Sequence, residues 1–261
     1  MTATDTPATG HIGQVRLRKE DARLVTGQAV WTDNITPAGT VFMAVVRSPM
    51  AHATIESIDT SAAARAEGVV EVLTGTDLAD VWQASLPSVW QVTEDVKEPP
   101  HYPLATDKVR HVGDGVAVVV ATSREAAVDA AELVDVSYEP LPAVVDMEEA
   151  LKDEVIIHED AGTNRCFTYQ WDSGNVDEVF AEADVIVERR YINQRLIPSA
   201  MEPRSVVAEP HSATGEYTLW SSTQVPHFVQ IFMALVTGIP QQSIRVIAPD
   251  VGGGFGSKLD F

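Results

Sequence analysis

Ile247-Ala-Pro-Asp-Val-Gly-Gly-Gly-Phe-Gly-Ser-Lys258 places four glycines within the five positions from Gly252 to Gly256, after a strand-like run at 244–248. Glycines can adopt positive φ angles and turn successive backbone N–H groups toward one point, because they lack a Cβ atom. We therefore predict a loop whose backbone closely approaches a ligand rich in hydrogen-bond acceptors. A mobile glycine hinge is the alternative that composition alone leaves open.

Two common glycine-loop motifs do not fit this spacing. A P-loop requires Gly-x-x-x-x-Gly-Lys-Ser/Thr, but Lys258 is preceded by Ser257 and followed by Leu259. The dinucleotide fingerprint Gly-x-Gly-x-x-Gly begins at Gly252 and Gly254 but meets Ser257 where its third glycine belongs. The sequence therefore excludes both motifs.

The chain has the composition of a core-forming protein with an acidic surface. Of its 261 residues, 45% are hydrophobic, and 38 acidic against 18 basic residues give a net charge of −20. This charge repels phosphate backbones, so we expect no nucleic-acid partner. No apolar run reaches the roughly 18 residues of a membrane span, and residues 1–10 lack the hydrophobic stretch of a signal peptide. We therefore predict a cytoplasmic protein without a membrane span.

Cysteine and histidine usage argues against a metal held by this chain's own side chains. Cys166 is the only cysteine, so the chain cannot ligate an iron–sulfur cluster through several thiolates. The seven histidines are scattered without a His-x-His or His-x-x-x-His pair. We predict that any electron-transfer cluster lies on another polypeptide.

Hydrophobic periodicity predicts an α+β protein in two parts, with a boundary in the acidic stretch 146–160. In the first part we expect strands at 41–47, 54–58, 69–73, 116–121 and 134–138, and helices at 59–66 and 122–133, the second opened by a capping box at 122–125. The apolar run at 116–121 predicts a strand buried on both faces. With the following helix and strand it is predicted to form a β-α-β unit.

The second part is predicted to contain one sheet and a long helix. We expect strands at 167–171, 184–194, 205–209 and 217–221, a short helix at 176–183, and a helix that begins near Pro226 and ends before Gly238. The apolar residues of that helix at helical spacing are predicted to face the core; they are Phe228, Ile231, Phe232 and Leu235.

Gln224 lies between the last of these strands and the long helix. Its side chain could cap the helix or bond a loop carbonyl, or it could converge with the glycine loop on one ligand, because both follow strands of one predicted sheet. Position alone leaves these alternatives open.

Several motifs, in this order, resemble the molybdenum-binding large subunits of the xanthine dehydrogenase, aldehyde oxidase and aerobic carbon monoxide dehydrogenase family. They are Arg47-Ser-Pro-Met-Ala-His-Ala53, Ile58-Asp-Thr-Ser61, Val109-Arg-His-Val-Gly113, Tyr138-Glu-Pro-Leu-Pro142, Pro198-Ser-Ala-Met-Glu-Pro-Arg204, Ser222-Thr-Gln-Val-Pro-His227 and Val251-Gly-Gly-Gly-Phe-Gly-Ser-Lys258. The resemblance spans residues 13–261. It implies an α+β fold with a flexible tail at 1–13, an α/β hammerhead domain at 14–145, a linker at 146–165, and the first part of a mixed α+β molybdopterin-binding domain at 166–261.

The resemblance also implies a molybdenum–molybdopterin cofactor, in its cytosine dinucleotide form, with no protein ligand to the metal. Gln224 would act in catalysis and cofactor binding by donating a hydrogen bond to the metal's oxo group. Gly253, Gly254, Phe255 and Gly256 would contact the cofactor through the backbone. Phe255 would also wall the substrate side, which makes it the second catalytic-site residue.

In this family the large subunit oxidises an aldehyde, an N-heterocycle or CO with water-derived oxygen. Electrons pass to 2Fe-2S clusters on a small subunit and to FAD on a medium subunit, and the complex is a dimer of heterotrimers. The family's catalytic glutamate lies beyond residue 261, so Glu202 is not expected to act as the base. We therefore expect an inactive fragment or one piece of a split subunit, with the remaining large-subunit segment as a partner. A non-catalytic assembly or interaction module is the alternative.

Overall fold

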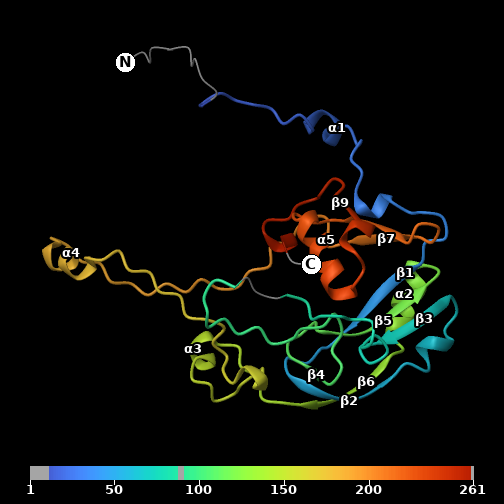
Figure 1. Ribbon diagram of the computed structural model, residues 1–261, viewed down its shortest axis with the longest axis horizontal. Coiled ribbons are helices and arrows are strands. Elements are labelled where there is room, and N and C mark those ends of the chain that lie inside the picture. The colour runs from blue at the N-terminus through green and yellow to red at the C-terminus, as the bar shows by residue number, and fades with distance from the viewer. Residues whose placement is uncertain (1–11, 88–90, 260–261) are drawn as a thin grey trace.

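A computed structural model describes residues 12–87 and 91–259, which form a mixed α+β chain (Figure 1). In this part of the chain the strands form three sheets of three strands each. Two of the sheets are built from residues before 141 and the third from residues after 205.

The first sheet has the strand order β1 (Phe42–Arg47), β5 (Gly115–Ala121), β3 (Val69–Thr74), and both pairings are antiparallel. β5 is the predicted apolar strand, and most of its residues are buried, as its unbroken apolar run predicts. Helix α2 (Arg124–Ala131) packs on β1 and β5, and its Ala130 contacts Val119 of β5 in the core.

The second sheet has the order β4 (Lys108–Val109), β2 (Ala53–Asp59), β6 (Asp135–Pro140), again antiparallel. The predicted β-α-β unit is therefore wrong, because β5 and β6 lie in different sheets. β5 already has an antiparallel strand on each side, so β6 pairs with the edge of β2 instead.

Two details of the predicted helices in this part also differ. The helix expected at 59–66 is a single 3-10 turn, η2 (Ala63–Arg65). The cap of α2 is Ser123, whose hydroxyl accepts a hydrogen bond from the Ala126 N–H, rather than the first residue of the predicted capping box. The short elements that complete the first 161 residues are α1 (Asp21–Val25), η1 (Thr32–Asn34), α3 (Met147–Ala150) and η3 (Glu159–Ala161).

The third sheet has the order β7 (Val206–His211), β8 (Glu216–Ser221), β9 (Ile244–Ile247); β7 pairs antiparallel and β9 parallel to β8. Helix α5 (Pro226–Thr237) connects β8 to β9 through η4 (Gln241–Ser243). As predicted, α5 has proline in its first turn, and Gly238 ends it in the left-handed conformation with φ 72°. Because β8 and β9 pair in parallel, their carboxyl ends lie at the same edge of the sheet.

Three of the four α5 residues that were predicted to face the core are exposed, and the fourth, Phe232, is half-buried. Phe228 is 39% exposed, Ile231 42% and Leu235 50%, whereas Val229 and Val236 are buried. The helix is apolar on more than one side, so spacing alone could not identify which side the sheet covers.

Residues 169–197, which we call the arm, project away from the rest of the molecule (Figure 1). Every residue of the arm is exposed, and its regular structure is α4 (Val176–Glu182) at the far end. The strands predicted at 167–171 and 184–194 are absent, because no described strand lies beside them to supply hydrogen-bond partners. Large apolar side chains are exposed as a result, among them Val185, Tyr191 and Ile197.

Across residues 12–87 and 91–259, no helix is both long and apolar enough to cross a membrane.

Candidate functional site

The glycine loop, residues 252–258, follows β9 and ends in the short turn η5 (Ser257–Leu259). Gly253 and Gly256 have φ angles of 106° and 88°, and the non-glycine residue Phe255 has a φ of 52°. A bulky residue in this left-handed region is strained, and such strain concentrates at ligand sites. The Phe255 side chain is 75% exposed.

The middle of this loop presents unpaired hydrogen-bond donors. Among the described residues, none accepts from the backbone N–H groups of Gly253, Gly254 or Phe255. Successive N–H groups in a loop with left-handed residues form a concave site for oxygen acceptors. The flanking N–H groups, by contrast, are held by protein contacts, which argues against a free hinge.

Gln224 is one of the residues that hold the loop. Its side-chain Oε1 accepts from the backbone N–H groups of Gly256 at 3.0 Å and Lys258 at 3.3 Å. The backbone N–H of Gln224 donates to the Lys258 carbonyl at 3.0 Å. It does not cap α5, whose N-cap position is Val225. The two donors at Oε1 identify the other atom of the amide as Nε2, which donates to no described residue.

Two of the glycines are required by close approaches within the site. A Cβ on the buried Gly254 would lie 2.6 Å from Cδ and 2.8 Å from Cγ of Gln224. A Cβ on Gly252 would collide with Cβ of Glu202. The structure therefore brings Gln224 and the predicted loop glycines together, with no room for larger residues at these positions.

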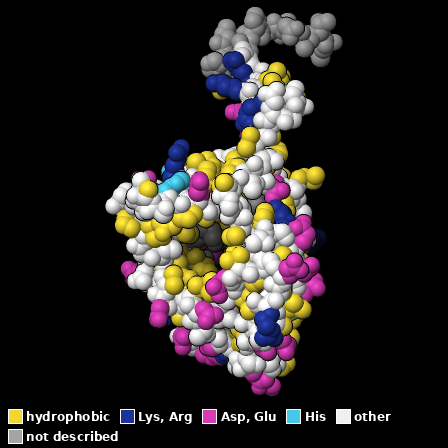
Figure 2. All heavy atoms as spheres, turned by 90° about the vertical axis from the view of Figure 1, so that its right-hand side faces the viewer, with side chains coloured by type: hydrophobic (Ala, Val, Ile, Leu, Met, Phe, Trp, Pro, Cys, Tyr) yellow, Lys and Arg dark blue, Asp and Glu magenta, His cyan; other side chains and the backbone are white. Residues whose placement is uncertain are grey.

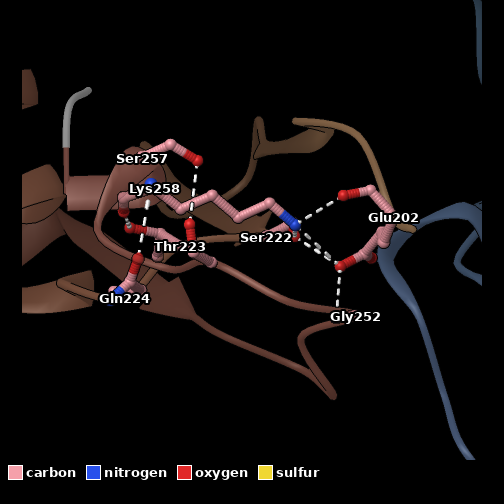
Figure 3. A network of polar contacts seen from close by, with 8 residues as sticks. Glu202, Ser222, Thr223, Gln224, Gly252, Ser257 and Lys258 are labelled. Atoms are coloured by element: carbon pink, nitrogen blue, oxygen red, sulfur yellow. Dashed lines mark hydrogen bonds and ion pairs between the residues drawn. The ribbon is translucent and has the colours of Figure 1, made fainter. Parts of the chain in front are cut away.

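Sequence reasoning missed a buried polar network behind the loop (Figure 3). Lys258 is 2% exposed, and its Nζ donates to the Glu202 carbonyl at 2.9 Å, to Glu202 Oε2 at 3.1 Å and to Ser222 Oγ at 2.6 Å. Both charged residues belong to quoted motifs, but their separation by 56 positions conceals the pairing.

Glu202 stays ionised in this network. Burial acts to raise the pKa of its carboxyl group, but hydrogen bonds from Ser222, the Gly252 N–H and Lys258 outweigh burial, and the net shift is downward. Oε2 accepts from Ser222 Oγ at 2.5 Å and from the Gly252 N–H at 2.7 Å, whereas the buried Oε1 has no partner in the described ranges. This carboxylate therefore has a structural role, since its Oε2 accepts hydrogen bonds that hold the loop.

The entrance to the loop is tied to the N-terminal segment. Arg23 holds both carboxylate oxygens of Asp250 at 2.5 Å, and the N–H of Val30 donates to Asp250 Oδ2 at 2.9 Å. The hydrogen bonds from Arg23 and Val30 lower the pKa of Asp250 to about 2.

The donors of the site fit a cofactor that is rich in oxygen acceptors. Gln224 Nε2 and three loop N–H groups are available to it. Within residues 12–87 and 91–259, no group of three or more His, Cys, Asp or Glu side chains could hold a metal ion.

The comparisons define the class of protein to which this fold and site belong. Residues 26–142 match the aldehyde oxidase and xanthine dehydrogenase a/b hammerhead domain, and residues 157–261 match the molybdopterin cofactor-binding domain. The chain thus combines a hammerhead domain with part of a molybdopterin-binding domain.

Similar proteins with this arrangement are large subunits of molybdenum enzymes. The chain is 37% identical to the carbon monoxide dehydrogenase large chain of Afipia carboxidovorans, over 95% of this chain and 32% of that protein. It is 38% identical to the nicotine 6-hydroxylase large subunit of Paenarthrobacter nicotinovorans, over 95% of this chain and 30% of that protein. The crystal structure of quinoline 2-oxidoreductase from Pseudomonas putida 86 superposes with a TM-score of 0.85 at 37% identity, over 94% of this chain and 31% of that chain.

The chain belongs to the family of the molybdenum-binding large subunits of xanthine dehydrogenase, aldehyde oxidase and carbon monoxide dehydrogenase. It spans about a third of the length of the curated relatives it matches.

Proposed function

We propose that this chain is part of the large subunit of a molybdenum hydroxylase, which oxidises a small molecule with water-derived oxygen. The observation that carries the proposal is the free Nε2 of Gln224 beside three unpaired N–H groups of the glycine loop. Molybdenum–molybdopterin, when bound, would supply the redox chemistry, and we propose its cytosine dinucleotide form. The alternative, a non-catalytic assembly module, is not favoured by any of the relatives reported above.

The residues of this chain have distinct roles in the proposal. Gln224 donates from Nε2 to an oxygen of the cofactor, because its Oε1 is already occupied by the loop. Gly253, Gly254, Phe255 and Gly256 contribute the backbone that contacts the cofactor. The exposed ring of Phe255 walls the substrate side.

We propose an aldehyde, an N-heterocycle other than a purine, or CO as the substrate. The relatives include enzymes named for CO and for nicotine. Leu259, directly after the loop, is 47% exposed and offers only apolar surface. Each purine donor or acceptor left unpaired against such a surface costs about 1–3 kcal/mol.

The exposed apolar surfaces support a partner that completes the fold. The arm exposes Val185, Tyr191 and Ile197, and α5 exposes Ile231 and Leu235. On one face of the molecule, hydrophobic side chains gather around a hollow (Figure 2). We infer that the remaining large-subunit segment covers these surfaces, since apolar surface of this extent marks interaction sites.

Membership of the family supports a proposal for the other partners. We propose an FAD-binding medium subunit and a small subunit with 2Fe-2S clusters, assembled as a dimer of heterotrimers. We further propose that the hammerhead domain occupies residues 14–145, the linker 146–165 and the molybdopterin-binding part 166–261. Of the tail expected at 1–13, residues 1–11 lie outside the described residues. The cytoplasmic location stays a prediction from the sequence.

Metal and pterin analysis of the purified complex, together with its activity, tests the proposal. The complex should contain molybdenum and pterin in stoichiometric amounts and reduce an artificial electron acceptor with CO, benzaldehyde or nicotinate. A correctly assembled complex without molybdenum would contradict the proposed function.

A further inference from the structure

One buried lysine joins the two ends of the glycine loop (Figure 3). At the end of the loop, the backbone N–H of Lys258 donates to Gln224 Oε1, and the Lys258 carbonyl accepts from the backbone N–H of Gln224. The Lys258 side chain then runs back to Glu202, whose Oε2 accepts from Gly252 at the start of the loop. The carbonyl of the same Gly252 accepts a hydrogen bond from the backbone N–H of Glu202 at 3.2 Å. One pair of charged residues, Lys258 and Glu202, therefore links the end of the loop to its start.

The ammonium group is fully satisfied in this position. Its three N–H bonds match three acceptors: the Glu202 carbonyl, Glu202 Oε2 and Ser222 Oγ. Ser222 lies two residues before Gln224, so the same contacts also fix the chain that leads to Gln224. A shift of Lys258 would move the amide of Gln224 and the loop together.

Stability alone does not account for this arrangement. Burying an ion pair is often no better for stability than apolar residues of similar volume, because both charges lose their hydration. The orphaned Glu202 Oε1 adds a second unfavourable feature, since a buried acceptor without a donor is costly. What the pair does provide is a fixed geometry with several directional bonds.

We propose that Lys258 and Glu202 are positioning residues. With Ser222, they hold the glycine loop and Gln224 so that Gln224 Nε2 and the free loop N–H groups face the bound ligand. They act through these groups and do not touch the reacting atoms. This inference rests on the proposed function, because it assigns the cofactor as the ligand that the positioned donors meet.

Two variants and two matched controls test the proposal. Ser222→Ala removes one hydroxyl and keeps the ion pair, and Lys258→Met removes the ammonium while keeping an unbranched side chain. Ser221→Ala, one residue away on β8, and Lys152→Met, which breaks the exposed ion pair with Glu149, are the controls. Hydrogen exchange of the segment 250–259 is measured in the full chain, and molybdenum content, kcat and KM in the assembled enzyme.

Both test variants should exchange the loop amides faster than either control, because opening of the loop becomes easier. In the assembled enzyme we expect a fall in kcat of about tenfold or more with little change in KM, the pattern of a lost transition-state interaction. If Lys258→Met does not fold, Ser222→Ala decides the test.

The inference is overturned if both test variants match their controls in loop exchange and in turnover. It is equally overturned if the loop exchanges faster while molybdenum content and kcat stay at the wild-type values. Failure of the proposed function has a different signature: the wild-type complex itself would lack molybdenum, whatever the variants do to the loop.

Discussion

Replacing Gln224 with alanine separates a role in chemistry from a role in folding. The substitution removes Nε2, the donor proposed to face the cofactor, together with the two hydrogen bonds that Oε1 accepts from Gly256 and Lys258. Gln224 and Gly256 are exposed, so water can replace the bond at Gly256. At roughly 1 kcal/mol for each hydrogen bond, the free energy of unfolding should fall by no more than about 2 kcal/mol.

The effect on turnover should be much larger than the effect on stability. Loss of one preorganised donor to developing charge lowers kcat by about 10²–10³, which corresponds to about 3 kcal/mol in the barrier. Steady-state kinetics of the assembled enzyme, referred to its molybdenum content, measures this loss. Chemical denaturation of the same preparation measures the change in stability.

Gln230→Ala is the matched control. Gln230 also makes two side-chain hydrogen bonds to the backbone, with Nε2 donating to the carbonyls of Gln241 and Ile244, and its Oε1 accepts a third from the Gln241 side chain, but it lies on α5 away from the loop. It should lose a similar amount of stability and keep its turnover. Equal kcat values for the two variants would refute the donor role and leave Gln224 with a structural role only.

Gly254→Ala should lower molybdenum content and turnover together, because its Cβ displaces the Gln224 side chain; a fully loaded, fully active variant would argue against the close approach. The chain of 261 residues, expressed alone, should bind far less than one molybdenum, measured by metal analysis, since the proposed remaining segment is absent. Trypsin should cut this isolated chain first in the arm, where Arg189, Arg190 and Arg195 are exposed, and mass spectrometry should find the same sites protected in the complex. The melting temperature of the wild type should exceed that of Asp250→Asn above about pH 4, and the difference should vanish toward pH 2. The pKa of Asp250 is held at about 2, below its usual value near 3.9. The ionised pair with Arg23 is therefore lost as pH falls through that range. Xanthine should be a poor substrate beside benzaldehyde, nicotinate or CO, and efficient xanthine turnover would contradict the role given to Leu259.

The parts of the fold that could be predicted are those encoded by neighbouring residues. The valine run of β5 indicates a buried strand wherever it pairs, and the proline and glycine that flank α5 determine both of its ends. The glycine loop is of the same kind at Gly253 and Gly256, because their positive φ angles favour glycine.

The parts that could not be predicted depend on contacts between distant segments. The arm has the composition of strands, but a strand needs a neighbour, and none of the described strands lies beside it. α5 carries apolar residues on the side of Phe228 and also on the side of Val229, so only the position of the sheet decides which side is buried. The Lys258–Glu202 pair is hidden for the same reason, since no local pattern relates residues 56 positions apart.

These two kinds of contact divide the site in a way that bears on how it is assembled. Among the described residues, the hydrogen bonds that hold Gln224, Lys258 and Glu202 together join residues 202–258 to one another, and Arg23 and Val30 add contacts at the entrance to the loop. The apolar surfaces of the arm and α5, by contrast, have no cover among the described residues. Because the donors are already in position, completing the fold has only to enclose the cofactor against them. A low molybdenum content of the isolated chain would then reflect missing enclosure rather than misplaced donors, and adding the proposed remaining large-subunit segment should restore binding without changing the loop.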